Sequence, residues 1–486
     1  MPVRGLDRAL QSSQCLSDPL LLVYVSTMDH PSSATSSVYL YFLAVIAAVG
    51  GFLFGFDLSI VSGAELFMAG HFELTPESRG FTVGCAVLGC MMGPPLVGMG
   101  LSDWLGRKKV LMIMALLFGV SAIGTALPRT IFEFNVFRIV GGIGVGVASI
   151  VSPMYIAEIA PAKIRGRLVV VNQLAIVSGS LFSALVAYAL TPDVSGIAAS
   201  ECWRWMFATE CIPVIVLLLG LILLPESPRW LVQKGRREEA QRVLAKVGGA
   251  EYAQRELQEI SAAMAEETGS LRELALPGIR IALFVAVTLA ILQQFTGVSS
   301  LMFFTPRVFQ MAGFESESMA ILQSAIMFAW NLGFTGLALV LVDRLGRRPL
   351  LIFGCVAMGV GLFLLGMCFH FKITGYWILA PLFIAVAAFN VSIAPLTWLI
   401  MSEIFPNRIR SKAMAIASMA IWTAAYLGAQ AFPVIVDVMR NRYGSPAGTF
   451  WIYSLVCVFT VFFAWTMVNE TKGKSLEEIG RSWMKQ

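Results

Sequence analysis

The sequence predicts an all-α integral membrane protein whose twelve transmembrane helices form two pseudo-symmetric six-helix bundles. Of its 486 residues, 57% are hydrophobic and only 13% are charged, and the mean hydropathy is +0.76. A soluble core could not cover so much apolar surface, whereas a bilayer takes about 20 apolar residues per helical span. Charged motifs also recur at matching places in the two halves of the chain, which indicates an internal duplication.

Twelve apolar runs, each bounded by polar or charged residues, mark the expected spans. Their approximate limits are 38–63, 80–101, 109–128, 131–156, 168–190, 204–224, 279–305, 319–342, 349–371, 376–402, 412–437 and 447–468. Each run is long enough to cross the hydrocarbon core as a helix. The first six are expected to form one bundle over 38–224, and the last six a second bundle over 279–468.

Three segments lie outside the expected bundles. Residues 1–37 are an N-terminal extension that we expect to be disordered, and 469–486 are a short C-terminal tail. The linker 225–278 contains 236–244 and 251–260, which are rich in helix formers and have apolar residues at three- and four-residue spacing. We expect amphipathic helices there, and a solvated linker is the alternative.

Basic residues predict the orientation in the membrane. Loops on the linker side carry Arg107, Lys108, Lys109, Lys163, Arg165, Arg167, Arg344, Arg347, Arg348, Arg408, Arg410 and Lys412. The opposite loops carry fewer, chiefly Arg79, Arg129, Arg307, Lys372, Arg440 and Arg442. Because basic loops stay in the cytoplasm, the sequence predicts a cell-membrane protein with both termini cytoplasmic. The net charge of +5 lies in these short loops and does not indicate nucleic-acid binding.

Three charged motifs occur in both halves, about 240 residues apart. They are 103–108 (DWLGRK) with 343–348 (DRLGRR), 158–167 (EIAPAKIRGR) with 403–412 (EIFPNRIRSK) and, more weakly, 225–229 (PESPR) with 469–473 (NETKG). Carboxylate–arginine pairs at helix ends can hold neighbouring helices together, so they are candidates for a cytoplasmic gate. The gate candidates are Asp103, Arg107, Glu158, Arg165, Glu226, Asp343, Arg347, Glu403 and Arg410. Plain anchoring of loops at the interface is the alternative.

A set of ordered motifs resembles the sugar porter family of the major facilitator superfamily. The motifs are 55–63 (GFDLSIVSG), 141–146 (GGIGVG), 153–161 (PMYIAEIAP), 225–230 (PESPRW) and 293–297 (QQFTG). The resemblance covers roughly residues 38–480 and is closest to the bacterial D-xylose–proton symporters, with the facilitative glucose transporters more distant. It implies the major facilitator fold and an intracellular salt-bridge network at the gate candidates.

Asp57 lies inside the first expected span, where a carboxylate is costly and by default functional. Arg138, near the outer end of the fourth span, is the expected partner, and protonation of Asp57 would release it. A permanent structural ion pair is the alternative. The resemblance implies a proton-coupling role, because proton-coupled sugar porters keep an aspartate here. Glu133 and Glu210 lie near expected span ends, and we assign both to the membrane interface.

Neutral amides and aromatic rings at the midplane suit the hydroxyl groups and apolar face of a sugar. Gln173, Gln293, Gln294, Asn331 and Trp398 supply that chemistry, and the resemblance implies that all five contact the substrate. Contact between helices is the alternative for any one amide alone. Ser299 stands where the family usually has asparagine, and Ser180, Phe303, Phe304 and Ile421 also depart from it. The pocket is therefore expected to be more apolar on its second-bundle side.

These features predict a proton-coupled symporter of a monosaccharide or small polyol, with alternating access to a midplane site between the bundles. A facilitative sugar uniporter is disfavoured by Asp57, and a sugar sensor by the short tail. We expect neither enzymatic activity nor a metal, because no nucleophile–base pair, Cys/His cluster or phosphate-binding glycine loop is found. The expected partners are the sugar or polyol, the proton and the bilayer, without a cofactor, a nucleic acid or an obligate protein partner.

Overall fold

The computed structural model describes residues 34–98, 100–266, 271–405, 407–470 and 472. Within these ranges the chain is almost entirely helical and has no strand. Twelve of the helical stretches there are long and apolar enough to cross a membrane. The predicted all-α membrane fold is therefore confirmed. The first 33 residues of the predicted extension, and most of the predicted tail, lie outside the described residues.

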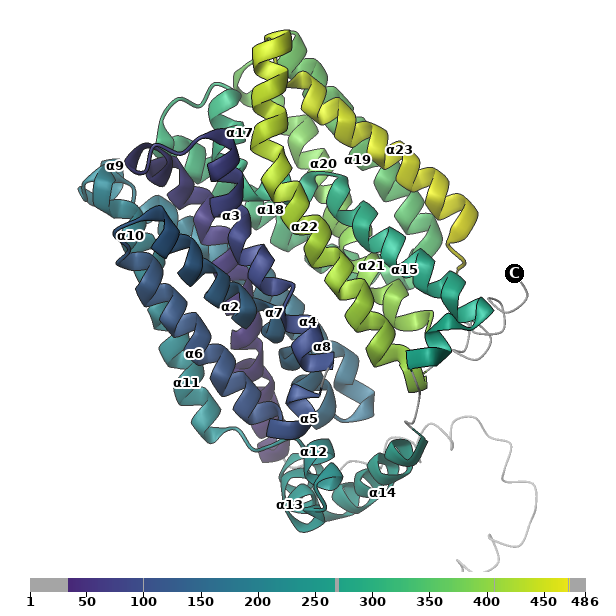
Figure 1. The fold of residues 1–486 in the computed structure, drawn as a ribbon. Helices are drawn as coiled ribbons and strands as arrows, with labels where there is room; N and C mark the ends of the chain where they lie inside the picture. The colour runs from purple at the N-terminus through teal and green to yellow at the C-terminus, as the bar shows by residue number, and fades with distance from the viewer. Residues whose placement is uncertain (1–33, 99, 267–270, 406, 471, 473–486) are drawn as a thin grey trace, which may run out of the picture.

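The first bundle occupies the lower left of Figure 1. Its helices are α2 (Ala34–His71), α3 (Pro76–Cys90), α4 (Gly93–Gly98), α5 (Leu101–Leu105), α6 (Arg107–Ala126), α7 (Ile131–Ile159), α8 (Ala162–Ala189), α9 (Pro192–Ser195), α10 (Ala199–Ala208) and α11 (Cys211–Leu223). Helix α2 packs along α8 and α7. The approach is so close that a Cβ atom on Gly55 of α2 would lie 1.8 Å from the carbonyl oxygen of Ile176 in α8. Small residues allow this packing, as is usual between membrane helices.

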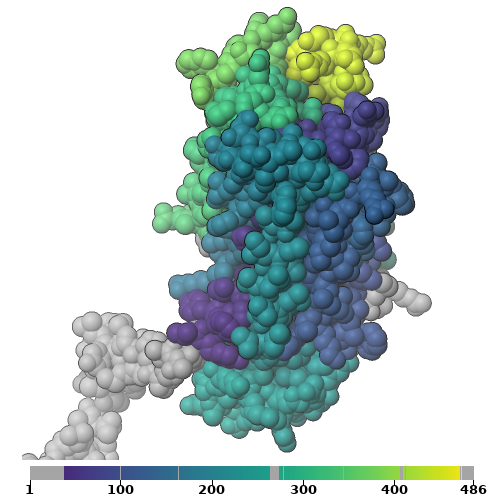
Figure 2. Space-filling view, turned by 90° about the vertical axis from the view of Figure 1, so that its left-hand side faces the viewer, coloured from purple at the N-terminus to yellow at the C-terminus, as the bar shows by residue number. Residues whose placement is uncertain are grey.

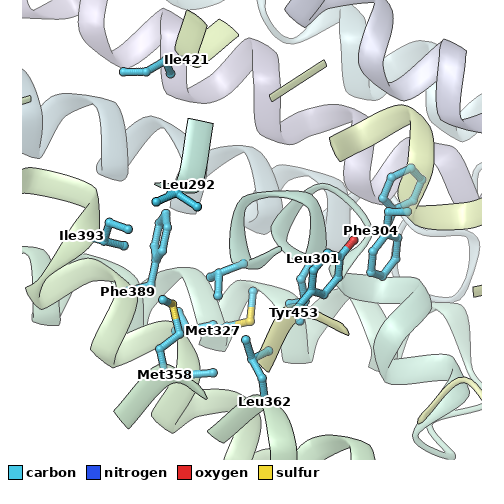
Figure 3. Close-up of a cluster of buried hydrophobic side chains, with 14 of the residues drawn as sticks. Leu292, Leu301, Phe304, Met327, Met358, Leu362, Phe389, Ile393, Ile421 and Tyr453 are labelled. Carbon is cyan, nitrogen blue, oxygen red and sulfur yellow. The ribbon is translucent and has the colours of Figure 1, made fainter. Parts of the chain in front are cut away.

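The second bundle occupies the upper right of Figure 1. It comprises η1 (Leu271–Ala275), α15 (Pro277–Phe295), α16 (Val298–Phe303), α17 (Thr305–Met311), α18 (Glu317–Leu345), α19 (Arg347–His370), η2 (Gly375–Ile378), α20 (Leu379–Val391), α21 (Ile393–Glu403), α22 (Asn407–Tyr443) and α23 (Ala447–Met467). Its interior is packed with large apolar side chains, and Figure 3 shows Phe389 and Ile393 directed toward Leu292 of α15. Buried contacts of this kind fix the helices that carry the polar site residues.

Along the chain, the two bundles are joined by α12 (Pro228–Gln233), α13 (Arg237–Gly248) and α14 (Ala250–Glu266). These three helices pack on one another at one end of the molecule (Figure 1). We call this end the linker face. The stretches 236–244 and 251–260 are helical, and the apolar side chains Ala240 and Leu244 of α13 are buried. The opposite face carries α9 and α17 (Figure 1). The start of η2 lies against the end of α17, since the N–H of Gly375 donates to the carbonyl oxygen of Ala312 at 2.8 Å.

Two predicted spans that the sequence suggested to be continuous are broken. In the expected span 279–305, helix α15 ends at Phe295 and a second helix, α16, begins after Gly297. The backbone of Gly297 is in the left-handed region, with a φ of 83°. The expected span 376–402 is interrupted at Ser392, which has φ −117° and ψ −95°. Pro395 follows three residues later and has no N–H to bond the carbonyl oxygen of Val391. The second break falls inside an apolar run, so hydropathy alone could not reveal it, whereas the first lies in the polar stretch 293–300 (QQFTGVSS), which the predicted span had included.

Exposed apolar side chains cover the sides of both bundles. Figure 2 shows one such side, where α10 and α11 run down the centre between α6 and the start of α2. Along α11 the large exposed side chains are Ile212, Ile215, Val216, Leu219, Ile222 and Leu223. An apolar surface of this extent is unfavourable in water and is expected against lipid tails.

We expect Gly297→Ala to lower thermal stability strongly. A Cβ atom at Gly297 would lie 2.3 Å from the ring of Tyr453, and its left-handed φ alone costs an L-residue about 1–2 kcal/mol. Gly235→Ala is the matched control, since Gly235 has a φ of +76° but no atom within 4 Å of the added Cβ. Thermal unfolding of both variants in detergent should show the larger loss at Gly297. Equal losses would mean that the Tyr453 ring moves aside at no cost.

Candidate functional site

A carboxylate and a guanidinium group are buried together in the first bundle. Asp57 of α2 and Arg138 of α7 are both 0% exposed. Nη1 of Arg138 donates to Oδ1 of Asp57 at 2.6 Å, and Nη2 donates to the Asp57 carbonyl oxygen at 3.0 Å. The ring of Phe207 lies 5.5 Å from the guanidinium carbon. The two residues that the sequence suggested as partners therefore meet in a site shielded from water.

Our assignment of Glu210 to the membrane interface is wrong. Glu210 lies at the junction of α10 and α11, is 0% exposed, and interacts electrostatically with Asp57 and Arg138. Among the described residues, no donor reaches either carboxylate oxygen of Glu210 or Oδ2 of Asp57, and Nε of Arg138 has no acceptor. Glu210 lies close enough to Asp57 for the two carboxyl groups to hydrogen-bond when one of them is protonated. Buried polar atoms normally have hydrogen-bond partners. One of these carboxylates can therefore take up a proton, or Arg138 can change its carboxylate partner. Glu133, in contrast, is exposed at the start of α7.

The buried charges need a glycine beside them. A Cβ atom on Gly141 of α7 would lie 3.4 Å from Oδ1 of Asp57 and only 2.3 Å from Oγ of Ser121. Ser121 is itself buried, and its hydroxyl has no partner within the described part of the chain. The glycine run that begins at Gly141 thus lets α7 approach α2 and α6 closely at the depth of the ion pair.

Two buried glutamines of α15 carry unused hydrogen-bond acceptors. Nε2 of Gln293 donates to the carbonyl oxygen of Ala394 at 3.3 Å, just after the α20–α21 break. The side-chain oxygens of Gln293 and Gln294 are buried and have no partner among the residues described. Asn331 of α18 is also buried; its Nδ2 lies 3.8 Å from the sulfur of Met302, and its Oδ1 accepts from Thr335 at 3.2 Å. The two free glutamine oxygens can accept hydrogen bonds from hydroxyl groups of a ligand.

Gln173 of α8 is exposed. Ala184 follows it by three helical turns, so both lie on the same face of α8. Ala184 is buried against Ala325 and Phe328 of α18, and Met302 packs on the same cluster. Met302 also contacts the amide of Asn331, so Asn331 lies close to this contact between the bundles. Gln173 lies three turns away from it along α8.

The short helix α16 presents three half-buried side chains on one face, namely Ser299, Met302 and Phe303. Phe303 packs against the apolar cores of both bundles and therefore lies where they meet. Trp398 of α21 is half-buried one turn after Ala394, the residue whose carbonyl oxygen accepts from Gln293. We take the amides on α8, α15 and α18, together with the half-buried groups on α16, as the candidate pocket.

The structure brings together an aromatic pair, one ring from each bundle, that the sequence interpretation did not include. Trp422 of α22 is buried against the core of the first bundle, and its ring lies 5.8 Å from that of Phe54 in α2. Its indole N–H is buried without a partner in the described part of the chain. Trp422 follows Ile421, which is almost completely buried in the second core (Figure 3). An isolated tryptophan in an apolar span gives no signal in the sequence that separates it from a core residue.

At the linker face, the first bundle holds a compact charged cluster. Arg107 is bound by Glu158 at 2.9 Å and by Asp103 at 3.0 Å. Glu226 accepts from the backbone N–H of Lys108 at 3.1 Å, at the start of α6. The Ser227 hydroxyl donates to the other oxygen of Glu158. A carboxylate at a helix N-terminus is favourable, so Glu226 fixes the end of α6.

The second bundle repeats this arrangement. Arg347 is bound by Glu403 at 2.9 Å, and Glu470 accepts from the backbone N–H groups of Arg347 and Arg348 at 3.1 and 3.0 Å. Glu470 therefore corresponds to Glu226, a match that the weak repeat at 469–473 only hinted at. The side chain of Asp343 lies outside the described residues. The ion pairs of Arg107 and Arg347 with described residues join helices of a single bundle.

Two gate candidates lie apart from these clusters. Arg165 contacts Glu256 of α14 at 3.5 Å and donates to the carbonyl oxygen of Ala160. Arg410 donates to the carbonyl oxygen of Phe405 at 3.4 Å. Partial burial lowers the pKa of Arg410, although a guanidinium group stays charged at any physiological pH. The structure therefore does not bring these two arginines to Glu158 and Glu403.

Comparison with known proteins gives consistent matches over nearly the whole chain. Residues 43–483 match the family model for "Sugar (and other) transporter". The chain is 38% identical to the D-xylose-proton symporter of Escherichia coli K12, over 92% of this chain and 96% of that one. It is 35% identical to the arabinose-proton symporter of Bacillus subtilis strain 168, again over 92% and 96%. A solved structure of the xylose transporter XylE from E. coli, partially occluded and inward open, has a TM-score of 0.80 and 37% identity, covering 90% of this chain and 100% of that one.

Proposed function

Since this chain belongs to the sugar (and other) transporter family, we propose that it is a proton-coupled symporter of a monosaccharide or small polyol. The buried pair of Asp57 and Arg138 carries the proposal. A carboxylate shielded from water and bound to one guanidinium can exchange that bond for a proton, and a facilitative uniporter would have no need of it. Two similar proteins, named as D-xylose-proton and arabinose-proton symporters, support the assignment.

The proposed cycle moves a proton and a sugar through one site by alternating access. A proton neutralises Asp57 and frees Arg138, whose charge then faces the buried carboxylate of Glu210. The sugar binds between the bundles, where the free oxygens of Gln293 and Gln294 accept from its hydroxyl groups. Gln173, Asn331 and Trp398 complete the proposed pocket, with Ser299 on α16. The proton is the coupling ion, and the scheme uses no other cofactor.

The proposed location is the cell membrane, with the linker face and both termini in the cytoplasm. The excess of basic residues on that side supports this orientation. The charged clusters around Glu158 and Glu403 are then a cytoplasmic gate, whose carboxylates stabilise helix ends that must close again when the inside is sealed. The proposed domains are the bundles 38–224 and 279–468, joined by the linker 225–278.

Asp57→Asn should abolish accumulation of sugar driven by a proton gradient while sparing sugar binding and exchange, because only the coupling group is removed. Uptake of a panel of labelled pentoses, hexoses and inositols into energised proteoliposomes measures the first property, and counterflow without a gradient measures the second. Glu133→Gln is the matched control, since it neutralises an exposed carboxylate at the start of the helix that carries Arg138. Accumulation by Asp57→Asn equal to that of the parent protein would make the ion pair structural.

Gln293→Ala should weaken sugar binding by about 1–3 kcal/mol, since a ligand hydroxyl loses its buried acceptor. The control is Asn390→Ala, because Asn390 is buried too but its amide donates at 2.8 Å to the carbonyl oxygen of Val386 in its own helix. Calorimetric titration with the transported sugar measures both affinities. If the two variants bind equally well, Gln293 does not belong to the pocket.

Reversing the charges in the double variant Glu158→Arg, Glu403→Arg should leave binding from outside largely intact and lower net transport by about tenfold or more, because the inward-closed state loses its ties. Glu239→Arg is the control: it reverses an exposed linker-face carboxylate that pairs only with Arg236 of the linker among the described ion pairs. Initial uptake rates in proteoliposomes compare the variants. Unchanged transport in the double variant would mean that the clusters only anchor loops at the membrane interface and do not form a gate.

A further inference from the structure

A buried carboxylate near the opposite face contacts one arginine from each bundle. Glu65 lies two turns beyond Asp57 on α2 and is 2% exposed. Its Oε1 lies 2.8 Å from Nε of Arg79 in α3, which belongs to the same bundle. From the second bundle, Arg307 of α17 donates to Oε1 at 3.0 Å and to Oε2 at 3.2 Å. The contact between the bundles is therefore a two-pronged arginine–carboxylate pair, the strongest geometry for such a bond.

The contact with Arg79 is of a different kind. Its Nε–H does not point at the carboxylate, so the pair is electrostatic rather than a hydrogen bond. Arg79 also interacts with Asp437 of α22. Because Arg79 and Glu65 belong to the same bundle, they can stay together when the bundles separate. Glu65 would then keep a positive neighbour throughout, and Arg307, which is 28% exposed, would be the partner that leaves.

Between described residues, the polar side-chain contacts that join the two bundles lie at this one face. Besides the Glu65–Arg307 pair, Ser318 of α18 donates to Asp193 of α9 at 2.5 Å, and Gln430 of α22 donates to the carbonyl oxygen of Glu77 at 2.9 Å. At the linker face, by contrast, the ion pairs between described residues stay within one bundle or join a bundle to the linker. In Figure 1 the bundles accordingly converge toward α9 and α17.

We propose that Glu65, Arg79 and Arg307 form an outer gate that opens at the Glu65–Arg307 pair once in every transport cycle. The proposal rests on the proposed function only in requiring that the bundles move relative to each other. Breaking the pair costs little overall, because Arg307 regains water while Arg79 continues to compensate Glu65. Arg79 is thus a positioning residue that holds the carboxylate ready, and Arg307 is the moving partner.

The test is hydrogen–deuterium exchange of the full chain in lipid nanodiscs, with neither sugar nor a proton gradient present. The variants are Glu65→Gln, Arg307→Gln and the double variant. Arg307→Gln is the more reliable, because Glu65 keeps Arg79 as its partner. Glu201→Gln is the matched control, since Glu201 pairs at the same face with Arg204 of its own helix.

Both single variants should raise exchange by roughly tenfold at the starts of α3 and α17 and lower it at α5 and the end of α21, as the population shifts from one face open to the other. The double variant should match the singles, because all three lack the same bond. The control should exchange like the parent protein. Unchanged exchange would overturn the proposal, and so would a rise confined to α17 without a fall at the linker face. Because the readout needs no transport, it stands apart from any failure to find a transported sugar.

Discussion

The burial of Asp57 against Arg138 is the constraint on which the first bundle depends. Two charges leave water there, and their mutual attraction offsets that cost only if the geometry is close and other polar groups surround them. Gly141 supplies the space, and Ser121 and Glu210 supply further polar atoms. The result is a site with more polar atoms than hydrogen bonds. Such a site is unfavourable as a permanent arrangement but well suited to one that changes its protonation and pairing.

The two bundles share the same charged contacts at the linker face, but they differ in the polar residues buried inside them. Both halves fix a helix start with a glutamate, Glu226 or Glu470, and both bind an arginine to a glutamate at the linker face. The fully buried ion pair among the described residues lies in the first bundle, and the free glutamine oxygens lie in the second. In the proposed mechanism the proton therefore binds in the first bundle, whereas the sugar contacts both bundles, through Gln173 of the first and Gln293 and Gln294 of the second. Phe303 and Trp422 pack at the contact surface that separates the two sites.

The sequence could predict a functional residue only where its chemistry differs clearly from that of the residues around it. Asp57 and Arg138 were predictable because a charge inside an apolar run has few explanations. Glu210 was misassigned because the expected span began at 204, whereas the span in the structure runs from Ala199 to Leu223 and places the carboxylate well inside it, at the junction of α10 and α11. The break at Ser392 was missed because hydropathy does not fall there, and the break at Gly297 was missed because the polar stretch 293–300 was included in one span. The contact of Arg165 with Glu256 was not predicted because Glu256 belongs to a linker helix whose position no sequence pattern could give.

The chemistry of the contacts between the bundles fits the energetic demands of alternating access. A carrier must populate both of its states, so neither face can be closed by more than a few kcal/mol without trapping the protein. Large apolar interfaces would give such deep minima. An ion pair such as that of Glu65 and Arg307 has strict geometry, yet the hydration lost on closing offsets much of its attraction. The boundary between the bundles also holds apolar contacts, such as Ala184 with Phe328 and Phe54 with Trp422. The ion pair therefore gives the closed face its geometry while adding little to the free energy needed to open it.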